Sequence, residues 1–97
     1  MKALRDPECA ELNHLVAACQ LPGTHFLEIG CGNGVFTWQY AGLPWQVVGI
    51  DPDEFEILQA KTDRPASLSN VSLTRAAGEA LSFPSRFFDI ALFASSL

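Results

Sequence analysis

The chain has 97 residues, enough for one domain with a single modest core. Hydrophobic residues make up 48% of it and charges are interspersed, which argues against disorder, and no apolar run approaches the roughly 20 residues of a membrane span. The net charge of −5, with six scattered lysines and arginines, lacks the basic patch that nucleic-acid binding requires. We therefore expect no nucleic-acid partner and no membrane partner.

A helix is predicted near the start of the chain. Asp6 followed by Pro7 is typical of a helix N-cap with proline at the first helical position. Apolar residues within 12–19 follow at the i, i+3, i+4 and i+7 spacing of one helical face, and Leu21-Pro22-Gly23 ends the pattern. Residues 1–22 are therefore predicted as an N-terminal helical segment that leads into the domain.

The three cysteines, Cys9, Cys19 and Cys31, are odd in number and have no C-x-x-C spacing. Reduced thiols in a cytoplasmic protein are the simplest interpretation. His14 lies near two of them in the sequence, but no set of ligands with the spacing of a zinc site is completed. We therefore predict a cytoplasmic protein without a metal site.

Strands alternate with helices in the rest of the sequence. The strands are predicted at residues 25–30, 46–51, 71–75 and 88–93, and the helices at about 35–41 and 53–62. Three of the four strands are nearly continuous apolar runs, as expected of a sheet that is covered on both faces. Strands alternating with helices form parallel β-α-β units with right-handed crossovers. The predicted fold class is therefore α/β, with a Rossmann-like doubly wound parallel sheet.

The most informative motif joins the first predicted strand to the helix after it. The run Phe26-Leu27-Glu28-Ile29 is followed by Gly30-Cys31-Gly32-Asn33-Gly34. Glycines at alternate positions ahead of a helix permit positive φ and close approach of a ligand to the backbone. The second strand ends on Asp51, where an open α/β sheet places a partner for ribose hydroxyls. The pattern indicates a cofactor site at the carboxyl edge of the sheet.

The glycine spacing distinguishes between two classes of cofactor. A dinucleotide fingerprint, G-x-G-x-x-G, requires glycine where Val35 or Thr37 stands. The order E-x-G-x-G-x-G over residues 28–34 instead resembles motif I of the class I S-adenosylmethionine-dependent methyltransferases. The resemblance continues through VVGID at residues 47–51 and AAGEALSFPSRFFDIALFASSL at residues 76–97, in the family's order and spacing. A dinucleotide-binding protein is a distant alternative.

The resemblance implies roles for the residues of this site. Glu28 would face the crevice and complement the ammonium of the cofactor's methionyl part, and Asp51 would accept hydrogen bonds from both ribose hydroxyls. Cys31 would fill the loop, since no evident base stands near it to make it a nucleophile. The cofactor-binding residues that the resemblance implies are Glu28, Gly30, Cys31, Gly32, Gly34, Asp51, Pro52, Gly78 and Glu79.

The loop after the third strand departs from the family's pattern. The family usually presents an aspartate there to the adenine amino group, but the aligned residue is Ala77, which cannot accept that hydrogen bond. Either Glu79 substitutes for it or the adenine contact is weaker here, while Gly78 keeps the backbone donor. Outside this site, Asp89 of the family's "FD" pair is predicted to have a structural role, and Trp38 and Trp45 are predicted to be packing residues around the first helix and the loop after it.

The resemblance implies a fold of seven strands in the order 3-2-1-4-5-7-6, of which this chain supplies about four, in the order 3-2-1-4. Two functions are open. The first is S-adenosylmethionine-dependent methyl transfer to an unidentified acceptor, most simply a small molecule, with S-adenosylhomocysteine as product. The second is a non-catalytic S-adenosylmethionine-binding module or a subunit that requires a partner. We assign no catalytic residue. Residues 88–93 would form an apolar edge strand, for which we expect a homodimer or a partner chain, and we expect the isolated chain to be inactive.

Overall fold

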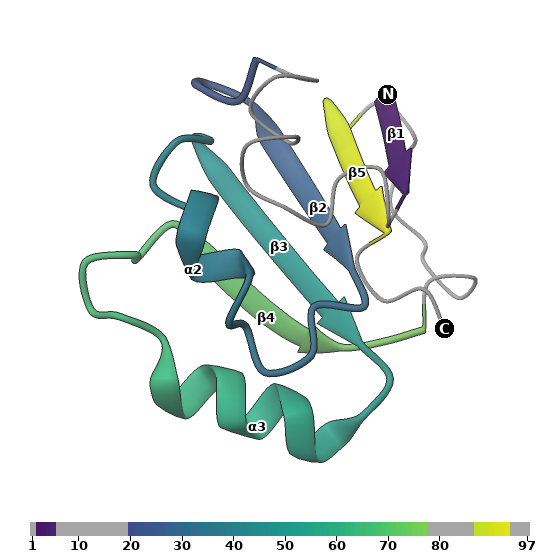
Figure 1. Ribbon diagram of the computed structural model, residues 1–97, viewed down its shortest axis with the longest axis vertical. Helices are drawn as coiled ribbons and strands as arrows, with labels where there is room; N and C mark the ends of the chain where they lie inside the picture. The colour runs from purple at the N-terminus through teal and green to yellow at the C-terminus, as the bar shows by residue number, and fades with distance from the viewer. Residues whose placement is uncertain (1, 6–19, 78–86, 94–97) are drawn as a thin grey trace.

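The computed structural model describes residues 2–5, 20–77 and 87–93. It contains one sheet of five parallel strands in the order β1-β5-β2-β3-β4 (Figure 1). The strands are β1 (Lys2–Arg5), β2 (His25–Ile29), β3 (Gln46–Asp51), β4 (Val71–Arg75) and β5 (Ile90–Phe93), and the helices are α2 (Thr37–Tyr40) and α3 (Glu54–Asp63). The α/β class and the parallel sheet predicted from the sequence are confirmed.

The predicted strands are found in the expected order. Counted from the β4 side, β4-β3-β2-β5 is the order 3-2-1-4. Strands β3 and β4 have the predicted bounds, whereas α2 is shorter than predicted because the residues before Thr37 form turns. Helix α3 begins at an N-cap, Asp53, whose carboxylate accepts hydrogen bonds from the backbone N–H groups of Phe55 and Glu56 at 2.9 and 3.2 Å.

Strand β1 is absent from the sequence-based prediction. Residues 2–5 were assigned to the N-terminal helical segment, but they pair in parallel with β5, from Lys2 opposite Ile90 to Arg5 opposite Phe93. The prediction that β5 is an exposed edge strand is therefore wrong, and with it the reason to expect a homodimer or partner chain there. An apolar strand with free backbone groups invites pairing, and this chain supplies the partner itself. The rest of the predicted N-terminal helix, residues 6–19, lies outside the described residues.

The sheet is packed on both faces. Alternate residues of a strand point to opposite faces, so Phe26 and Glu28 of β2 share the face that α2 and α3 cover, while Leu27 lies on the other. The core under the two helices includes Phe26, Tyr40, Val47, Ile57, Ala60 and Leu73. The opposite face carries a smaller cluster made of Leu27, Val48, Ile50, Phe88 and Ala91. Within the part of the chain that the structure describes, neither helix has the length and apolar character to cross a bilayer.

The amino-terminal edge of the sheet is fixed by a reciprocal pair of hydrogen bonds and a group of rings. The carboxylate of Asp89 accepts a hydrogen bond from the backbone N–H of His25 at 2.8 Å, and the backbone N–H of Asp89 donates to the carbonyl of His25, also at 2.8 Å. The centroid of the His25 ring lies 4.9 Å from that of Trp45 and 5.5 Å from that of Phe87. Trp45 is 66% exposed, so the prediction that it is a packing residue is wrong except for this contact with His25. The structural role predicted for Asp89 is confirmed, since it aligns β2 with β5.

Candidate functional site

The glycine loop between β2 and α2 has the backbone that its sequence predicts. Gly30, Gly32 and Gly34 have φ values of +82°, +57° and +89°, and no residue other than glycine in the described chain has a positive φ. The N–H groups of Gly30 and Cys31 both donate to the carbonyl of Ile50, at 2.8 and 3.0 Å. The left-handed conformations turn the chain back over the end of β3, which places the loop at the carboxyl edge of the sheet.

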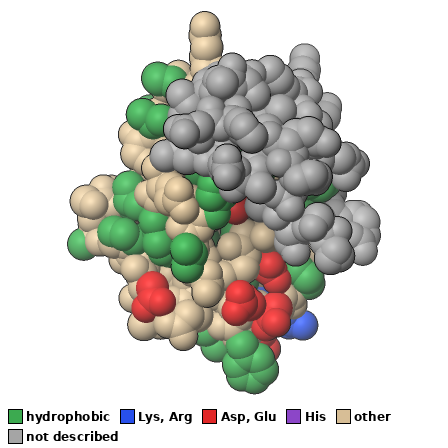
Figure 2. Space-filling view, in the orientation of Figure 1, with side chains coloured by type: hydrophobic (Ala, Val, Ile, Leu, Met, Phe, Trp, Pro, Cys, Tyr) green, Lys and Arg blue, Asp and Glu red, His purple; other side chains and the backbone are tan. Residues whose placement is uncertain are grey.

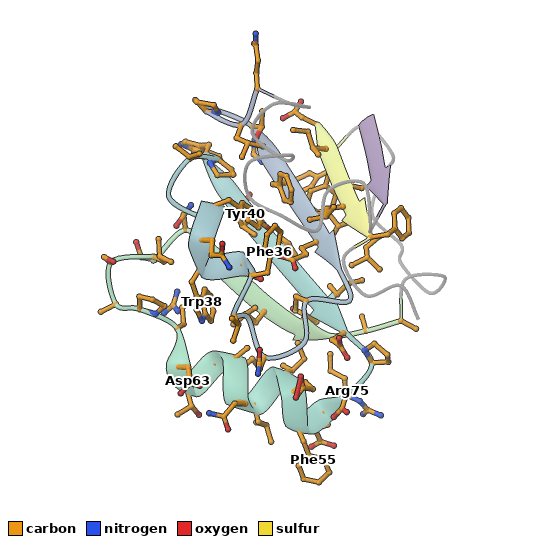
Figure 3. The ribbon with its side chains drawn as sticks, in the orientation of Figure 1. Phe36, Trp38, Tyr40, Phe55, Asp63 and Arg75 are labelled. Carbon is orange, nitrogen blue, oxygen red and sulfur yellow. The ribbon has the colours of Figure 1, made fainter. Side chains whose placement is uncertain are left out.

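Contacts within the protein also leave little space at two of these glycines, least of all at Gly34. A Cβ atom at Gly34 would lie 2.4 Å from Cζ2 of Trp38, so the indole occupies the space that a side chain would need. A Cβ atom at Gly32 would lie 3.1 Å from a carboxylate oxygen of Glu56, which reaches the loop from the first turn of α3. Figure 3 shows Trp38 projecting from α2, where it packs against the core as predicted. The loop is therefore held between the two helices.

Cys31 anchors the loop to the sheet. A Cβ atom at Gly49 of β3 would lie 3.1 Å from the Cys31 sulfur and 3.1 Å from Leu73, so the thiol fills the notch that Gly49 leaves. Burial raises the pKa of the Cys31 thiol to about 12, and the charges of Glu28, Asp51 and Glu56 act in the same direction. The side chain is a protonated thiol at neutral pH, which agrees with a loop-filling role rather than a nucleophilic one.

Asp51 connects the glycine loop to the start of α3. One of its carboxylate oxygens accepts a hydrogen bond from the backbone N–H of Gly32 at 3.0 Å, and the other accepts from the N–H of Asp53 at 2.9 Å. Its side chain is largely buried, with 9% exposed. Each carboxylate oxygen has capacity for a further hydrogen bond, so this arrangement leaves room for the two ribose contacts that the sequence predicts. Asp51 therefore organises the site as well as facing it.

The turn after Asp51 is tied to the end of β4. Nε of Arg75 donates to the carbonyl of Pro52 at 3.2 Å, and the backbone N–H of Ala76 donates to the carbonyl of Asp51 at 3.1 Å. Arg75 is exposed beside this turn and is labelled in Figure 3. The adenine loop predicted after β4 is described only as far as Ala77, because Gly78 and Glu79 lie outside the described residues.

Glu28 differs most from its expected placement. It was expected to face an open crevice, but its side chain is only 1% exposed and lies under α2. One carboxylate oxygen, Oε1, accepts hydrogen bonds from the hydroxyl of Thr37 at 2.7 Å and the hydroxyl of Tyr40 at 2.6 Å. Burial raises the pKa of Glu28 to about 7, although both hydroxyls act to lower it. The acid is therefore placed beneath the glycine loop and inside the protein.

Negative charge gathers around the loop. Glu28, Asp51 and Glu56 all act on the Cys31 thiol, and Figure 2 shows further Asp and Glu side chains over the region of α3. No group of three His, Cys, Asp or Glu side chains in the described residues is placed to hold a metal ion. The chain is thus an α/β protein with an acidic site at its glycine loop, at the carboxyl edge of a parallel sheet.

Comparison with known proteins identifies the family. Residues 26–97 match the family described as "Methyltransferase domain", and the chain belongs to this family. The Ubiquinone biosynthesis O-methyltransferase of Rhizobium johnstonii is 34% identical over 90 residues, which cover 92% of this chain and 36% of that protein. The chain thus spans roughly a third of the length of this curated relative. Its fold and family are those of S-adenosylmethionine-dependent methyltransferases.

Solved structures agree with this assignment. An S-adenosylmethionine dependent methyltransferase from Mesorhizobium loti is 28% identical, with a TM-score of 0.69 over 86% of this chain and 38% of that one. The [4+2]-cyclase SpnF is also 28% identical, with a TM-score of 0.70 over 84% of this chain and 32% of that one. The second name shows that related chains of this fold carry different activities.

Four residues of the site escaped the sequence-based prediction: Thr37, Tyr40, Glu56 and Arg75. The first two leave a detectable signal, because they are hydroxyl-bearing residues three apart in a short helix that follows a buried acid. Glu56 and Arg75 leave none, since an acid in the first turn of a helix and an arginine at a strand end are ordinary surface residues in sequence.

Proposed function

We propose that this chain binds S-adenosylmethionine at the glycine loop, and that the protein of which it forms the cofactor-binding part transfers the methyl group to an acceptor. The observation that carries the proposal is the left-handed loop of Gly30, Gly32 and Gly34 tied to Asp51 by the N–H of Gly32. Glycine at alternate positions leaves part of the loop backbone without side chains of its own, and Asp51 retains acceptor capacity for ribose hydroxyls. The residues present therefore fit a nucleoside cofactor.

The charge of the site favours this cofactor over a dinucleotide. S-adenosylmethionine carries a sulfonium and an ammonium group, and both are attracted by carboxylates in a poorly solvated site. Asp51 and Glu56 provide that field, and Glu28 adds to it when it is ionised. A pyrophosphate would instead be repelled by the same carboxylates. Gly78 and Glu79, and the backbone of Pro52, are proposed to complete the adenine end of the site.

When bound, the cofactor supplies an activated methyl group. The residues of this chain bind and orient it, and they keep acidic groups near its cationic end. We propose a small molecule as the acceptor, by analogy with the O-methyltransferase name of the Rhizobium relative. We place the reaction in the cytoplasm, because the cysteine pattern suits a reducing compartment. No residue of the described chain is proposed as a catalytic base.

A second candidate is a cofactor-binding part that does not transfer methyl groups. This second candidate is supported by the similarity to a protein named as a cyclase, because proteins that share this fold can catalyse different reactions. A methyl-transfer assay with hydroxyl-bearing small molecules as acceptors separates the two candidates. Product formation supports the transferase, while cofactor binding without turnover by the natural full-length protein supports the second candidate.

Calorimetric titration tests the binding proposal. We expect S-adenosylmethionine and S-adenosylhomocysteine to bind with dissociation constants of roughly micromolar to tens of micromolar, about 6–8 kcal/mol, because Ala77 removes one adenine contact. NAD should bind more weakly than either. Tighter binding of NAD would contradict the proposal and favour a dinucleotide-binding protein.

A further inference from the structure

The carboxylate of Glu28, with the hydroxyls of Thr37 and Tyr40, forms a closed buried cluster beneath the glycine loop. The three side chains are 1%, 0% and 0% exposed. Both hydroxyls donate to the same oxygen of Glu28, at 2.7 and 2.6 Å, and both come from α2, the helix that the glycine loop enters. The acid thus lies on β2 at one end of the loop and its donors lie at the other end.

The surroundings of this acid contain no compensating positive charge among the described residues. The titratable groups that act with it are the Tyr40 hydroxyl on α2 and the Cys31 thiol in the loop. Its register partners are Gly49 on β3 and Leu92 on β5, neither of which is ionisable. The nearby charges, Asp51 and Glu56, act on the Cys31 thiol and are also negative. A proton on Glu28 is therefore retained by burial, and only the two hydroxyls favour its loss.

We propose that Thr37 and Tyr40 are positioning residues that set the protonation of Glu28, and that uptake of a cationic cofactor at the glycine loop expels a proton from this acid. The inference rests on the proposed function, because it needs a cationic ligand beside the loop. The proton passes from the carboxylic acid to solvent, and no other bond is made or broken. Binding of the cation favours the carboxylate form, and by linkage ionisation of Glu28 strengthens binding by the same factor.

Proton linkage predicts a pH profile that a purely structural cluster would not show. The pKa of Glu28 in the free protein is about 7, so about half of the molecules hold the proton at pH 7. Cofactor binding at pH 7 should therefore release about half a proton per molecule bound. Affinity for S-adenosylmethionine should rise about tenfold between pH 6 and pH 8 if the bound state stays ionised throughout.

Calorimetry in two buffers with different ionisation enthalpies measures this release directly. The probe is S-adenosylmethionine itself, titrated at pH 6, 7 and 8. Glu28→Gln, which keeps the shape of the side chain, should abolish the release and flatten the pH profile. Tyr40→Phe removes a donor that lowers the pKa of Glu28, so it should increase the release at pH 7 and move the profile to higher pH. Glu54→Gln, at an exposed acid of α3, is the matched control and should leave the release unchanged.

The outcomes separate this inference from the proposed function. Binding with the same apparent enthalpy in both buffers would overturn the proton linkage and leave the cofactor site standing. Proton release that persists in Glu28→Gln would also overturn it, because another group would then be the source. Absence of cofactor binding would overturn both proposals. Should Glu28→Gln fail to fold, as judged by circular dichroism, the shifted profile of Tyr40→Phe decides the question.

Discussion

The carboxyl and amino ends of the parallel strands form two edges of the sheet, and these are built in different ways. At the carboxyl edge, glycines in left-handed conformations direct the N–H of Gly30 to the carbonyl of Ile50 and the N–H of Gly32 to the carboxylate of Asp51. At the amino-terminal edge, Asp89 clamps β2 to β5 and the rings of His25, Trp45 and Phe87 pack together. Backbone conformation thus shapes the carboxyl edge, where we propose that the cofactor binds, whereas side-chain contacts at the other edge hold the strands in register.

The largest expected effect comes from filling the glycine loop. Gly34→Ala should destabilise the fold by about 2–5 kcal/mol, because the residue has a φ of +89° and its Cβ would meet the Trp38 ring at 2.4 Å. Denaturant unfolding measures the loss. Gly42→Ala is the control, since nothing lies within 4 Å of its Cβ and its φ is not left-handed; we expect a change of less than about 0.5 kcal/mol. Equal effects of the two variants would show that the loop is not tightly packed.

The next effect concerns the buried acid of the carboxyl edge. The pKa of Glu28 in the folded chain, about 7, lies above its ordinary value of 4.5, so the folded state holds a proton that the unfolded state releases. Stability should therefore fall as pH rises from about 4.5 to about 7, by up to about 3 kcal/mol. Glu28→Gln should remove this slope. Unfolding by urea across that pH range tests it, and a stability that rises with pH in both proteins would contradict the burial of an uncompensated acid.

A smaller effect is expected at Asp51, measured in cofactor affinity. Asp51→Ala removes the acceptor of the ribose contacts and frees the N–H of Gly32, so the dissociation constant for S-adenosylmethionine should rise at least tenfold. Asp63→Asn, at an exposed acid at the far end of α3, is the control and should leave the affinity unchanged. Unaltered affinity in a folded Asp51→Ala protein would show that Asp51 does not bind the ribose and only connects the loop to α3.

The smallest effect is expected from Asp89, at the amino-terminal edge of the sheet. Asp89→Ala removes the bond from His25 N–H and should cost about 1–2 kcal/mol of stability while leaving cofactor affinity within twofold. Asp89→Asn keeps a carbonyl acceptor and should recover most of the loss. A large change in affinity for either variant would mean that the two edges are coupled.

The sequence predicts the strands of the sheet better than the chemistry of its site. Strands β3 and β4 follow from apolar runs and alternation, and the glycine loop follows from three glycines at fixed spacing. The burial of Glu28 does not follow, because it depends on where α2 packs and on hydroxyls nine and twelve residues away. Strand β1 does not follow either, since four residues without periodicity give no signal and their partner lies at the other end of the sequence.

The pairing of β1 with β5 has a consequence for how the chain folds. It joins Lys2 to Ile90, so the intervening chain must be closed into a loop before these backbone groups meet. The entropy of closing so long a loop is recovered only once β5 has paired with β2 and offers its other side to β1. Of these five strands, the one that comes first in the chain would therefore be the last to join the sheet, and amide exchange in β1 should report the earliest local opening of the folded protein.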